Sequence, residues 1–422
     1  MKVKILLILL CLSAFLTTCT QKEKTCVITG KVINRPQSTQ LRLTRAFVDY
    51  RSQTAVLIPI KDSTFNYEIK FKDIEAYKLV FQDEYIQGNM LPITFFTTNS
   101  TISMELYPRE ESKKNIISGG KENNEFLEYQ KKKNDEIDKK TKPIMDSLKV
   151  LQVNDAYESQ LMKDLYKKLE ITEKKEDQYK MYIQMDELYR SGEGLSPAAK
   201  KLDAQYDSLR KIIQDKEIEF IKENITIPNY YALIQSLLNS EDSPKIFDHD
   251  DLSALQKEYA ARFKNHPFTN YSNEVSWRLV NMKPGGDFFD FKLPDLNGME
   301  YTLSEEIKGK YAFIDIWAPW CGPCIAKSRE MIPLFESYKE KEFTVIGVAS
   351  KYQEIADVEK LLEKDKYPWI TLIDKPELDS RINEHYGIEM AGGGCVLVDK
   401  AGKIVLVNPS VEEVAKVLEA NL

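Results

Sequence analysis

Histidine and clustered cysteine are scarce in this chain. Its 422 residues include three histidines, no two of them at the spacing of metal ligands, and a single Cys-x-x-C pair. A histidine-rich metal site is therefore not expected, and a zinc site built on that pair would lack two further ligands. The net charge of −7 leaves no basic excess to meet phosphates, which argues against generic nucleic-acid binding.

Long hydrophobic runs are missing from the body of the chain. No stretch of about 18 apolar residues occurs after the first twenty positions, so no transmembrane helix is expected there. Hydrophobic residues nevertheless make up 42% of the chain, with 22 Tyr and 18 Phe, which is enough to build folded cores. At about 100–200 residues per domain, the length predicts two to four domains.

The start of the chain has the pattern of an export signal. Lys2 and Lys4 are basic, and residues 5–15 form an apolar stretch that is too short to span a bilayer stably. Residues 16–19, Leu-Thr-Thr-Cys, resemble a bacterial lipobox, in which cleavage precedes the cysteine that receives the lipid. We therefore expect a lipoprotein signal peptide over 1–18 and membrane anchoring through acyl chains on Cys19. The alternative is an ordinary signal peptide with an incidental cysteine.

Residues 19–118 contain runs that alternate apolar and polar side chains and are rich in β-branched and aromatic residues. These runs lie at 26–33, 41–44, 65–69, 77–81 and 101–106. Their period of two predicts half-buried antiparallel strands, without any cluster of acids, bases or nucleophiles. The pattern resembles the small β-domain, of the DUF4369 type, that precedes a thioredoxin-like domain in lipoproteins of Bacteroidota. This resemblance implies no chemistry for the region.

Residues 119–282 are dominated by Lys, Glu, Asp and Gln, with apolar residues recurring at steps of three and four. This periodicity predicts long amphipathic helices. Helix ends are expected at Pro143, Pro197, Pro228 and Pro267. The charge runs favour solvated helix faces, with a partner-binding surface as the alternative. Residues 248–251, Asp-His-Asp-Asp, favour a turn or a helix cap over a metal site.

Residues 283–422 change to an alternation of apolar runs and helical segments. The runs at 311–317 and 343–349 are nearly continuous, which predicts buried central strands. Helical patterns lie at 324–338, 355–362 and 377–386, and a hairpin is expected from 395–399 and 403–407. Ser410 and Glu413 form a capping-box pattern at the start of a last helix. The predicted order is β-α-β-α-α-β-β-α.

One motif carries chemistry, the Cys-Gly-Pro-Cys sequence at 321–324, where a buried strand passes into a helix. Cys321 would lie at a helix N-terminus, where unpaired N–H groups and the helix dipole favour a thiolate. In such motifs the cysteine pKa falls from about 8.5 toward 7 or below, so the sulfur is nucleophilic near neutral pH. Cys324, nearly one turn later, can attack the mixed disulfide that forms. Pro323 fits the first helical turn, and Gly322 relieves crowding beside the nucleophile.

This segment resembles the thioredoxin superfamily and, within it, the exported TlpA/ResA-like thiol–disulfide oxidoreductases. The lead-in over 289–298, the active-site tryptophans Trp317 and Trp320, and the Cys-Gly-Pro-Cys motif carry the resemblance, which covers residues 283–422. It implies that Cys321 attacks and Cys324 resolves. It also implies that Asp315 is a buried acid that assists proton transfer from the resolving cysteine, with a pKa raised by desolvation. The alternative is a solvent-exposed acid at a strand end.

Two positions depart from the family pattern. The family places a cis-proline in the loop that faces the active site, and the corresponding position here is Gly393, within Ala-Gly-Gly-Gly-Cys at 391–395. Because cis peptide bonds without proline are rare, we expect this loop to differ. The helix proline usually found five residues after the second cysteine is replaced by Arg329. Pro333 follows one turn later, so a kink is expected further from the site.

Two other cysteines are expected in the mature chain. Cys395 lies two residues after Gly393, where it could serve as a third redox thiol. The alternative, a buried core cysteine on a strand, is favoured for Cys395 and more strongly for Cys26.

Export, lipid attachment and a dithiol motif together predict a periplasm-facing envelope thiol–disulfide oxidoreductase that reduces or exchanges protein disulfides, on either the inner or the outer membrane. The expected fold is multidomain, with an N-terminal antiparallel β-domain, a central α-helical region and a C-terminal thioredoxin-like α/β domain. The expected partners are disulfide-containing envelope proteins and a membrane thiol reductant, with no cofactor, metal or nucleic acid. The alternative is a lipid-anchored binding or structural protein with a degenerate thioredoxin domain. A thiol peroxidase is disfavoured, because Ala318 holds the place where that chemistry needs Thr or Ser.

Overall fold

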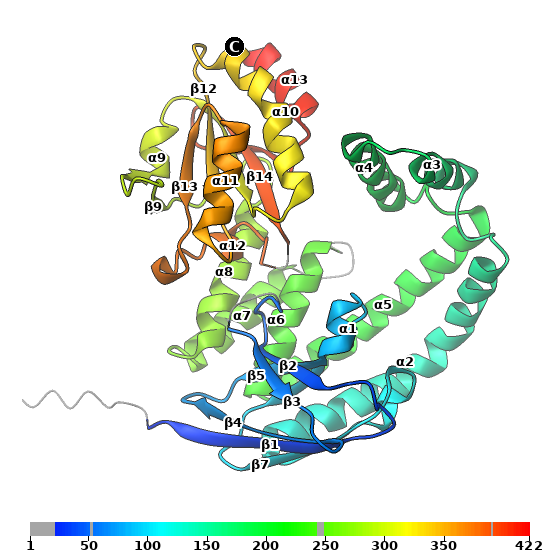
Figure 1. Cartoon of the computed structure of the whole chain (residues 1–422). Helices are drawn as coiled ribbons and strands as arrows, with labels where there is room; N and C mark the ends of the chain where they lie inside the picture. The colour runs from blue at the N-terminus through cyan, green and yellow to red at the C-terminus, as the bar shows by residue number, and fades with distance from the viewer. Residues whose placement is uncertain (1–21, 51–53, 243–248, 390) are drawn as a thin grey trace, which may run out of the picture.

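The computed structural model describes residues 22–50, 54–242, 249–389 and 391–422, so the predicted signal peptide and Cys19 lie outside the described residues. Figure 1 shows an N-terminal β-region at one end of the molecule, a C-terminal α/β domain at the other, and helices between them and to one side. Within the described residues, no helix combines the length and the apolarity that crossing a bilayer would require.

The N-terminal β-region consists of two four-stranded sheets. One sheet has the order β4 (Thr64–Phe71), β1 (Lys24–Val32), β7 (Thr101–Leu106) and β8 (Ile116–Ser118). The other has the order β3 (Val56–Pro59), β2 (Gln40–Arg45), β5 (Ala76–Phe81) and β6 (Ile93–Phe96). Both sheets contribute fully buried side chains to one core, among them Ile28, Leu41 and Ile102. The alternating pattern therefore marks the faces that two sheets turn toward each other.

The prediction of purely antiparallel pairing in this region is wrong for one pair. Strands β1 and β7 are parallel, whereas β1 pairs antiparallel with β4. The chain forms the whole of the second sheet between β1 and β7, and such a long crossover allows parallel pairing that a hairpin does not. The short strands β3, β6 and β8 were not predicted. The remaining elements are the short helix α1 (Gln82–Ile86) and a 3-10 turn at Arg109–Lys114.

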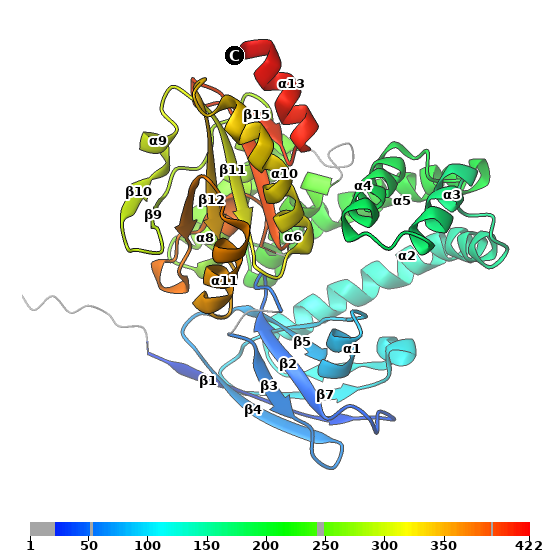
Figure 2. The same ribbon diagram turned by 45° about the horizontal axis from the view of Figure 1, so that its top comes forward.

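The central region is helical, as the periodicity predicts. Its helices are α2 (Lys121–Val153), α3 (Gln160–Glu170), α4 (Lys175–Ser191), α5 (Pro197–Glu223), α6 (Ile227–Asp242), α7 (His249–Arg262) and α8 (Pro267–Asn281). Figures 1 and 2 both show α2 and α5 running side by side as an arm that carries α3 and α4 at its far end. The predicted helix end at Pro143 is wrong, since α2 continues through it. The ends at Pro197, Pro228 and Pro267 are also wrong, since each of these prolines lies in the first turn of a helix.

The base of the helical region shares a core with the second β-sheet. Phe96 of β6 packs edge-on against Phe126 of α2 and Tyr231 of α6, and these rings belong to one buried cluster that continues to Val275 of α8. This apolar contact fixes α6, α7 and α8 on the β-region. The same helix α8 reaches the C-terminal domain through α12 (Ile382–His385), so it contacts both ends of the molecule.

The C-terminal domain is built on a five-stranded mixed sheet. Its order is β13 (Ile370–Ile373), β12 (Phe343–Ala349), β11 (Tyr311–Trp317), β14 (Gly393–Val398) and β15 (Ile404–Val407). The hairpin β9 (Lys292–Pro294) and β10 (Glu300–Thr302) and the helices α9 (Leu303–Glu306), α10 (Gly322–Tyr338), α11 (Ile355–Asp365) and α13 (Val411–Asn421) complete it. The predicted capping box of Ser410 and Glu413 is present.

Two details of this domain differ from the sequence prediction. Strand β13 was not predicted, although it pairs parallel with β12 at the sheet edge. The predicted helix over 377–386 is instead a 3-10 turn at Pro376–Leu378 followed by the short α12, because Asp379 and Arg381 adopt left-handed backbone angles that interrupt helical hydrogen bonding. With β13 included, the order from β11 onward alternates strands and helices up to the β14–β15 hairpin.

Candidate active site

Cys321 and Cys324 form a disulfide at the start of α10, directly after the central strand β11. Cys321 is the N-cap residue of α10, and its sulfur accepts a hydrogen bond from the backbone N–H of Cys324 at 3.4 Å. Both cysteines are partly exposed, and Gly322 and Pro323 between them are exposed. The helix start therefore directs an N–H group at the first sulfur, which is the arrangement that favours an anion there.

The tryptophans of the motif have different surroundings. Trp317 is fully buried at the end of β11, whereas Trp320, directly before Cys321, is 47% exposed. The indole N–H of Trp320 donates to the Lys351 carbonyl oxygen at 2.9 Å, which fixes the orientation of the ring. Trp320 thus forms an exposed, oriented apolar surface beside the disulfide, and Trp317 supports the strand beneath it.

A glycine loop approaches the disulfide from the other side. A Cβ atom on Gly392 would lie 2.9 Å from the Cys321 sulfur, and one on Gly393 would lie 2.9 Å from the Cys324 sulfur and 2.2 Å from the Ile316 carbonyl oxygen. A side chain at either position would clash, so the strand can run this close only with glycine. Gly393, which is predicted to correspond to the family's cis-proline, begins β14 beside the Cys324 sulfur, and the described residues contain no cis peptide bond.

Asp315 lies inside the domain, on β11, and its alternative placement at the surface is wrong. It is 2% exposed, and Ser328 of α10 donates a hydrogen bond to its carboxylate at 2.6 Å. Burial raises the pKa of Asp315 to about 6, against the opposing effects of the Ser328 hydrogen bond and the nearby Lys327. The Ser328 hydroxyl also lies 3.1 Å from the Cys324 carbonyl oxygen, so a hydrogen-bonded group connects the acid to the turn that bears the second cysteine.

Cys395 is a buried core residue of β14, as the favoured interpretation of the sequence predicts. It is 4% exposed and unoxidised, and it pairs in register with Asp315 across the sheet. Burial raises the pKa of Cys395 to about 12, and the approach of the Lys327 ammonium at 3.4 Å only partly opposes this effect. A neutral, enclosed thiol is a poor nucleophile, so the structure does not support its use as a third redox cysteine.

The segment that leads into the glycine loop is held by side chains from two other elements. The Lys351 ammonium donates to the carbonyl oxygens of Ile388, Glu389 and Ala391, the last two at 2.7 and 2.8 Å. Arg278 of α8 forms an ion pair with the Glu389 carboxylate at 2.6 Å, and both side chains are at most 10% exposed. The loop behind the disulfide is therefore fixed partly from outside its own domain.

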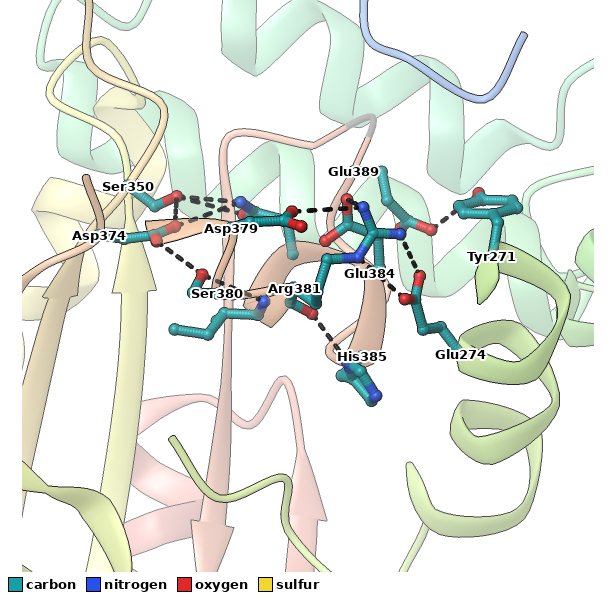
Figure 3. Close-up of polar contacts among 12 residues, drawn as sticks. Tyr271, Glu274, Ser350, Asp374, Asp379, Ser380, Arg381, Glu384, His385 and Glu389 are labelled. Carbon is teal, nitrogen blue, oxygen red and sulfur yellow. Dashed lines mark hydrogen bonds and ion pairs between the residues drawn. The ribbon is translucent and has the colours of Figure 1, made fainter. Parts of the chain in front are cut away.

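Figure 3 shows the polar contacts between α8 and the C-terminal domain. Tyr271 donates to the Glu389 carboxylate at 2.9 Å, and Glu274 accepts two hydrogen bonds from Arg381, at 2.9 and 2.5 Å. Partly buried, charge-assisted contacts of this kind are directional and fix the orientation of the two parts. The helical region is thus attached to the domain close to its reactive end.

Several of these residues were missed by the sequence analysis. Ser328 lies four residues after Cys324, on the same helix face, so helical spacing alone could have indicated it. Tyr271 and Glu389 lie 118 positions apart and carry no common motif, so no local signal could have paired them. The same holds for Lys351, a lysine in a polar loop.

Comparison with known proteins agrees with this geometry. The model of the Redoxin family matches residues 283–421. A thiol-disulfide oxidoreductase ResA from Bacillus cereus is 30% identical over 138 residues, which are 33% of this chain and 76% of that relative. The ResA of Bacillus thuringiensis is 31% identical over 124 residues, covering 29% of this chain and 68% of that relative.

Two solved structures are also similar over the C-terminal third. The thioredoxin domain of a thiol-disulfide oxidoreductase from Bacteroides vulgatus shares 26% identity at a TM-score of 0.30, covering 33% of this chain and 96% of that one. A thiol:disulfide interchange protein from Bacteroides sp. also shares 26% identity at a TM-score of 0.30, covering 33% and 90%. From the sequence relatives, matched over most of their length, we conclude that this chain belongs to the ResA-like thiol–disulfide oxidoreductases, with a thioredoxin-like domain over residues 283–421.

Proposed function

We propose that this protein is a lipid-anchored thiol–disulfide oxidoreductase of the cell envelope that reduces or exchanges protein disulfides through Cys321 and Cys324. The observation that carries the proposal is the position of Cys321, a partly exposed residue whose sulfur accepts an N–H hydrogen bond at the start of α10. This position favours a thiolate in the reduced form. A buried structural cysteine such as Cys395 lacks both this exposure and the position at a helix start.

The reaction proceeds in two exchanges. The Cys321 thiolate attacks one sulfur of the client disulfide, forms a mixed disulfide and releases the other client sulfur as a thiolate. Cys324 then loses its proton and attacks the Cys321 sulfur, which restores the internal disulfide and releases the second client sulfur. Two electrons pass from the enzyme dithiol to the client. A thiol reductant at the membrane regenerates the dithiol by the same exchange.

Asp315 is proposed to accept the proton of Cys324 in the second exchange. Its pKa of about 6 leaves the carboxylate mostly ionised near neutral pH and makes it a stronger base than an exposed aspartate. The proton then leaves with the departing client thiolate. The hydrogen bond from Ser328 holds the carboxylate in place, and the contact of Ser328 with the Cys324 carbonyl oxygen keeps that acid next to the resolving turn.

Anchoring through Cys19 would place this chemistry at a membrane surface. The lipobox-like sequence at 16–19 supports it, and acyl chains provide attachment without a spanning helix. The proposed clients are disulfide-containing proteins of the same compartment, where disulfides persist. Mass measurement of the mature N-terminus would test the anchor. An unmodified Cys19 would contradict it.

The proposed activity can be tested by trapping the client. A Cys324→Ser variant should stop after the first exchange and accumulate a mixed disulfide on Cys321, which mass mapping would identify. The wild-type protein, reduced by a dithiol, should turn over protein disulfides, and Cys321→Ser should not. Equal turnover in wild type and Cys321→Ser would refute the proposal.

A further inference from the structure

A cleft separates the β-region from the C-terminal domain next to the disulfide. This cavity has a volume of about 1010 Å³. We call it the interdomain cleft and define it by six of its lining residues: Arg42, Phe47 and Tyr85 on the β-region side, and Trp320, Lys360 and Glu389 on the side of the C-terminal domain. Trp320 directly precedes Cys321, so the cleft extends away from the reactive sulfur along the surface of the protein.

The wall on the β-region side is held rigidly. Phe47 stacks on Tyr271 with ring centroids 4.8 Å apart and planes 19° apart. The Arg42 guanidinium lies 4.4 Å from the centre of the Tyr85 ring and donates to the Tyr50 carbonyl oxygen at 2.7 Å. The aromatic and cationic groups that face the cleft therefore have fixed positions before anything binds.

The opposite wall is fixed by the contacts described above. Trp320 is oriented by its hydrogen bond to Lys351, and Glu389 is held by Arg278 and Tyr271. Tyr271 therefore contacts both walls at once, since it stacks on Phe47 and donates to Glu389. Together with the Arg278–Glu389 and Arg381–Glu274 contacts, Tyr271 of α8 links the two walls of the cleft. Preorganised walls reduce the ordering entropy that binding would otherwise require.

The lining suits a polypeptide in extended conformation. Aromatic rings of Phe47, Tyr85 and Trp320 provide apolar contact, and both charge signs are present. On α11, Asp357, Lys360 and Lys364 line the cleft at helical spacing, so no single sign dominates. The volume is at the upper end for small-molecule sites and far below that of a folded domain.

We propose that the interdomain cleft binds the client as an extended segment and presents its disulfide to Cys321, so that the β-region and α8 select unfolded or flexible clients. This inference rests on the proposed oxidoreductase function and adds to it the substrate class. A folded client could not enter the cleft, because the cavity of about 1010 Å³ is far smaller than a folded domain. The β-region then serves as half of a substrate site.

The experiment compares two disulfides that release the same chromophore, 5-thio-2-nitrobenzoate, on reduction by the full-length reduced protein. One is the small symmetrical disulfide of that thiol. The other is a short disordered peptide whose cysteine is disulfide-bonded to the same thiol. The quantity of interest is the ratio of kcat/KM for the peptide to kcat/KM for the small disulfide. Tyr85→Ala, which removes the ring, should lower this ratio by about three- to tenfold. Lys360→Ala, which changes a residue of the opposite wall, should lower the same ratio of kcat/KM values.

Matched controls lie next to each variant. Ile86 follows Tyr85 on α1, is 73% exposed and does not line the cleft, so Ile86→Ala should keep the wild-type ratio. Glu359 precedes Lys360 on α11, is exposed and does not line the cleft, so Glu359→Ala should also keep it. Circular dichroism and urea unfolding of all four variants would show whether any change reflects misfolding.

Hydrogen exchange of the Cys324→Ser protein, measured with the peptide trapped on Cys321, provides a direct readout. Bound peptide should protect the backbone amides of the protein both at 42–50 and at 355–365. Protection confined to residues around Cys321 and Gly392, together with unchanged ratios in Tyr85→Ala and Lys360→Ala, would overturn the inference while leaving the oxidoreductase intact. If both segments are already protected before peptide is added, and sedimentation shows a dimer, the cleft binds a second copy of the protein. That result would also overturn the inference. Absence of Cys321-dependent turnover on either disulfide would instead refute the proposed function.

Discussion

The β-region and the C-terminal domain both place cysteines on or beside a central strand, and their surroundings differ completely. Cys26 lies inside β1, near the start of that strand, and is fully buried, and burial raises the pKa of its thiol. Cys321 lies just beyond the end of β11, partly exposed, with an N–H group directed at its sulfur. The two cysteines differ because Cys321 lies at the boundary between a strand and a helix, whereas Cys26 lies inside a strand.

This comparison shows that local position decides what a cysteine can do. A strand interior satisfies the backbone within the sheet and excludes water, so the sulfur stays neutral. A helix start leaves N–H groups unpaired and open to solvent, which stabilises an anion and lets a client reach it. Cys395, on β14 of the same domain as Cys321, behaves like Cys26, so the domain as a whole does not confer reactivity.

The largest effect is expected from exchanging the two kinds of cysteine for serine. Cys321→Ser should reduce disulfide turnover by at least about 1000-fold, because serine cannot form the thiolate nucleophile. Cys26→Ser should leave kcat unchanged, although it places a hydroxyl in an apolar core. Turnover of a chromogenic disulfide measures both. A comparable loss in both variants would break the distinction drawn above.

Asp315→Asn should slow turnover by about 100-fold at pH 7, because it removes the proposed proton acceptor for Cys324. The same change should stabilise the protein. Burial raises the pKa of Asp315 to about 6, above the ordinary value of 3.8, so the folded state binds the proton more tightly and its stability falls as the pH rises through that window. Asparagine removes this cost. Above pH 6, Asp315→Asn should therefore raise the free energy of unfolding by up to about 3 kcal/mol, and below pH 4 it should give no such gain. Urea unfolding of the variant and the wild type at pH 4 and pH 8 measures this difference in stability. The same difference at both pH values would contradict a raised pKa for Asp315.

Glu389→Gln tests the attachment of the reactive loop to α8. It removes the Glu389 carboxylate charge that faces the buried Arg278, which should lower the free energy of unfolding by about 3–5 kcal/mol. Because the loop adjoins the disulfide, KM for protein clients should rise as well. The double variant Arg278→Met with Glu389→Leu should recover part of the stability, since it removes both charges. Failure of the double variant to exceed the single one in urea unfolding would show that the ion pair is not the relevant contact.

The smallest effect is expected from alkylating the native, oxidised protein. Cys26 and Cys395 are buried with raised pKa values, so iodoacetamide near neutral pH should leave both unmodified. Reduction should expose Cys321 to rapid labelling and leave the other two unchanged. Peptide mapping distinguishes the sites. Labelling of Cys395 at a rate similar to that of Cys321 would restore it as a candidate third thiol.

Local patterns predicted much of the C-terminal domain. The apolar run at 311–317, followed by Cys-Gly-Pro-Cys, specifies a buried strand that passes into a helix, and the structure has β11 and α10 there. The hairpin and the capping box at Ser410 were predicted for the same reason, since their signals lie within a few residues. Strand β13 was not predicted, because an edge strand of four residues is too short to show a clear hydrophobic periodicity.

The sequence is sufficient to specify the dithiol unit: two cysteines, the residues between them and the helix start at which the first one lies, all within one short segment. The surroundings of that unit depend on the tertiary fold. The burial of Asp315 requires α10 to cover the sheet, the close approach of Gly392 requires β14 to lie beside β11, and the interdomain cleft requires α8 to join two distant parts through Tyr271. Each of these depends on contacts between residues far apart in the chain, and no local spacing encodes such contacts.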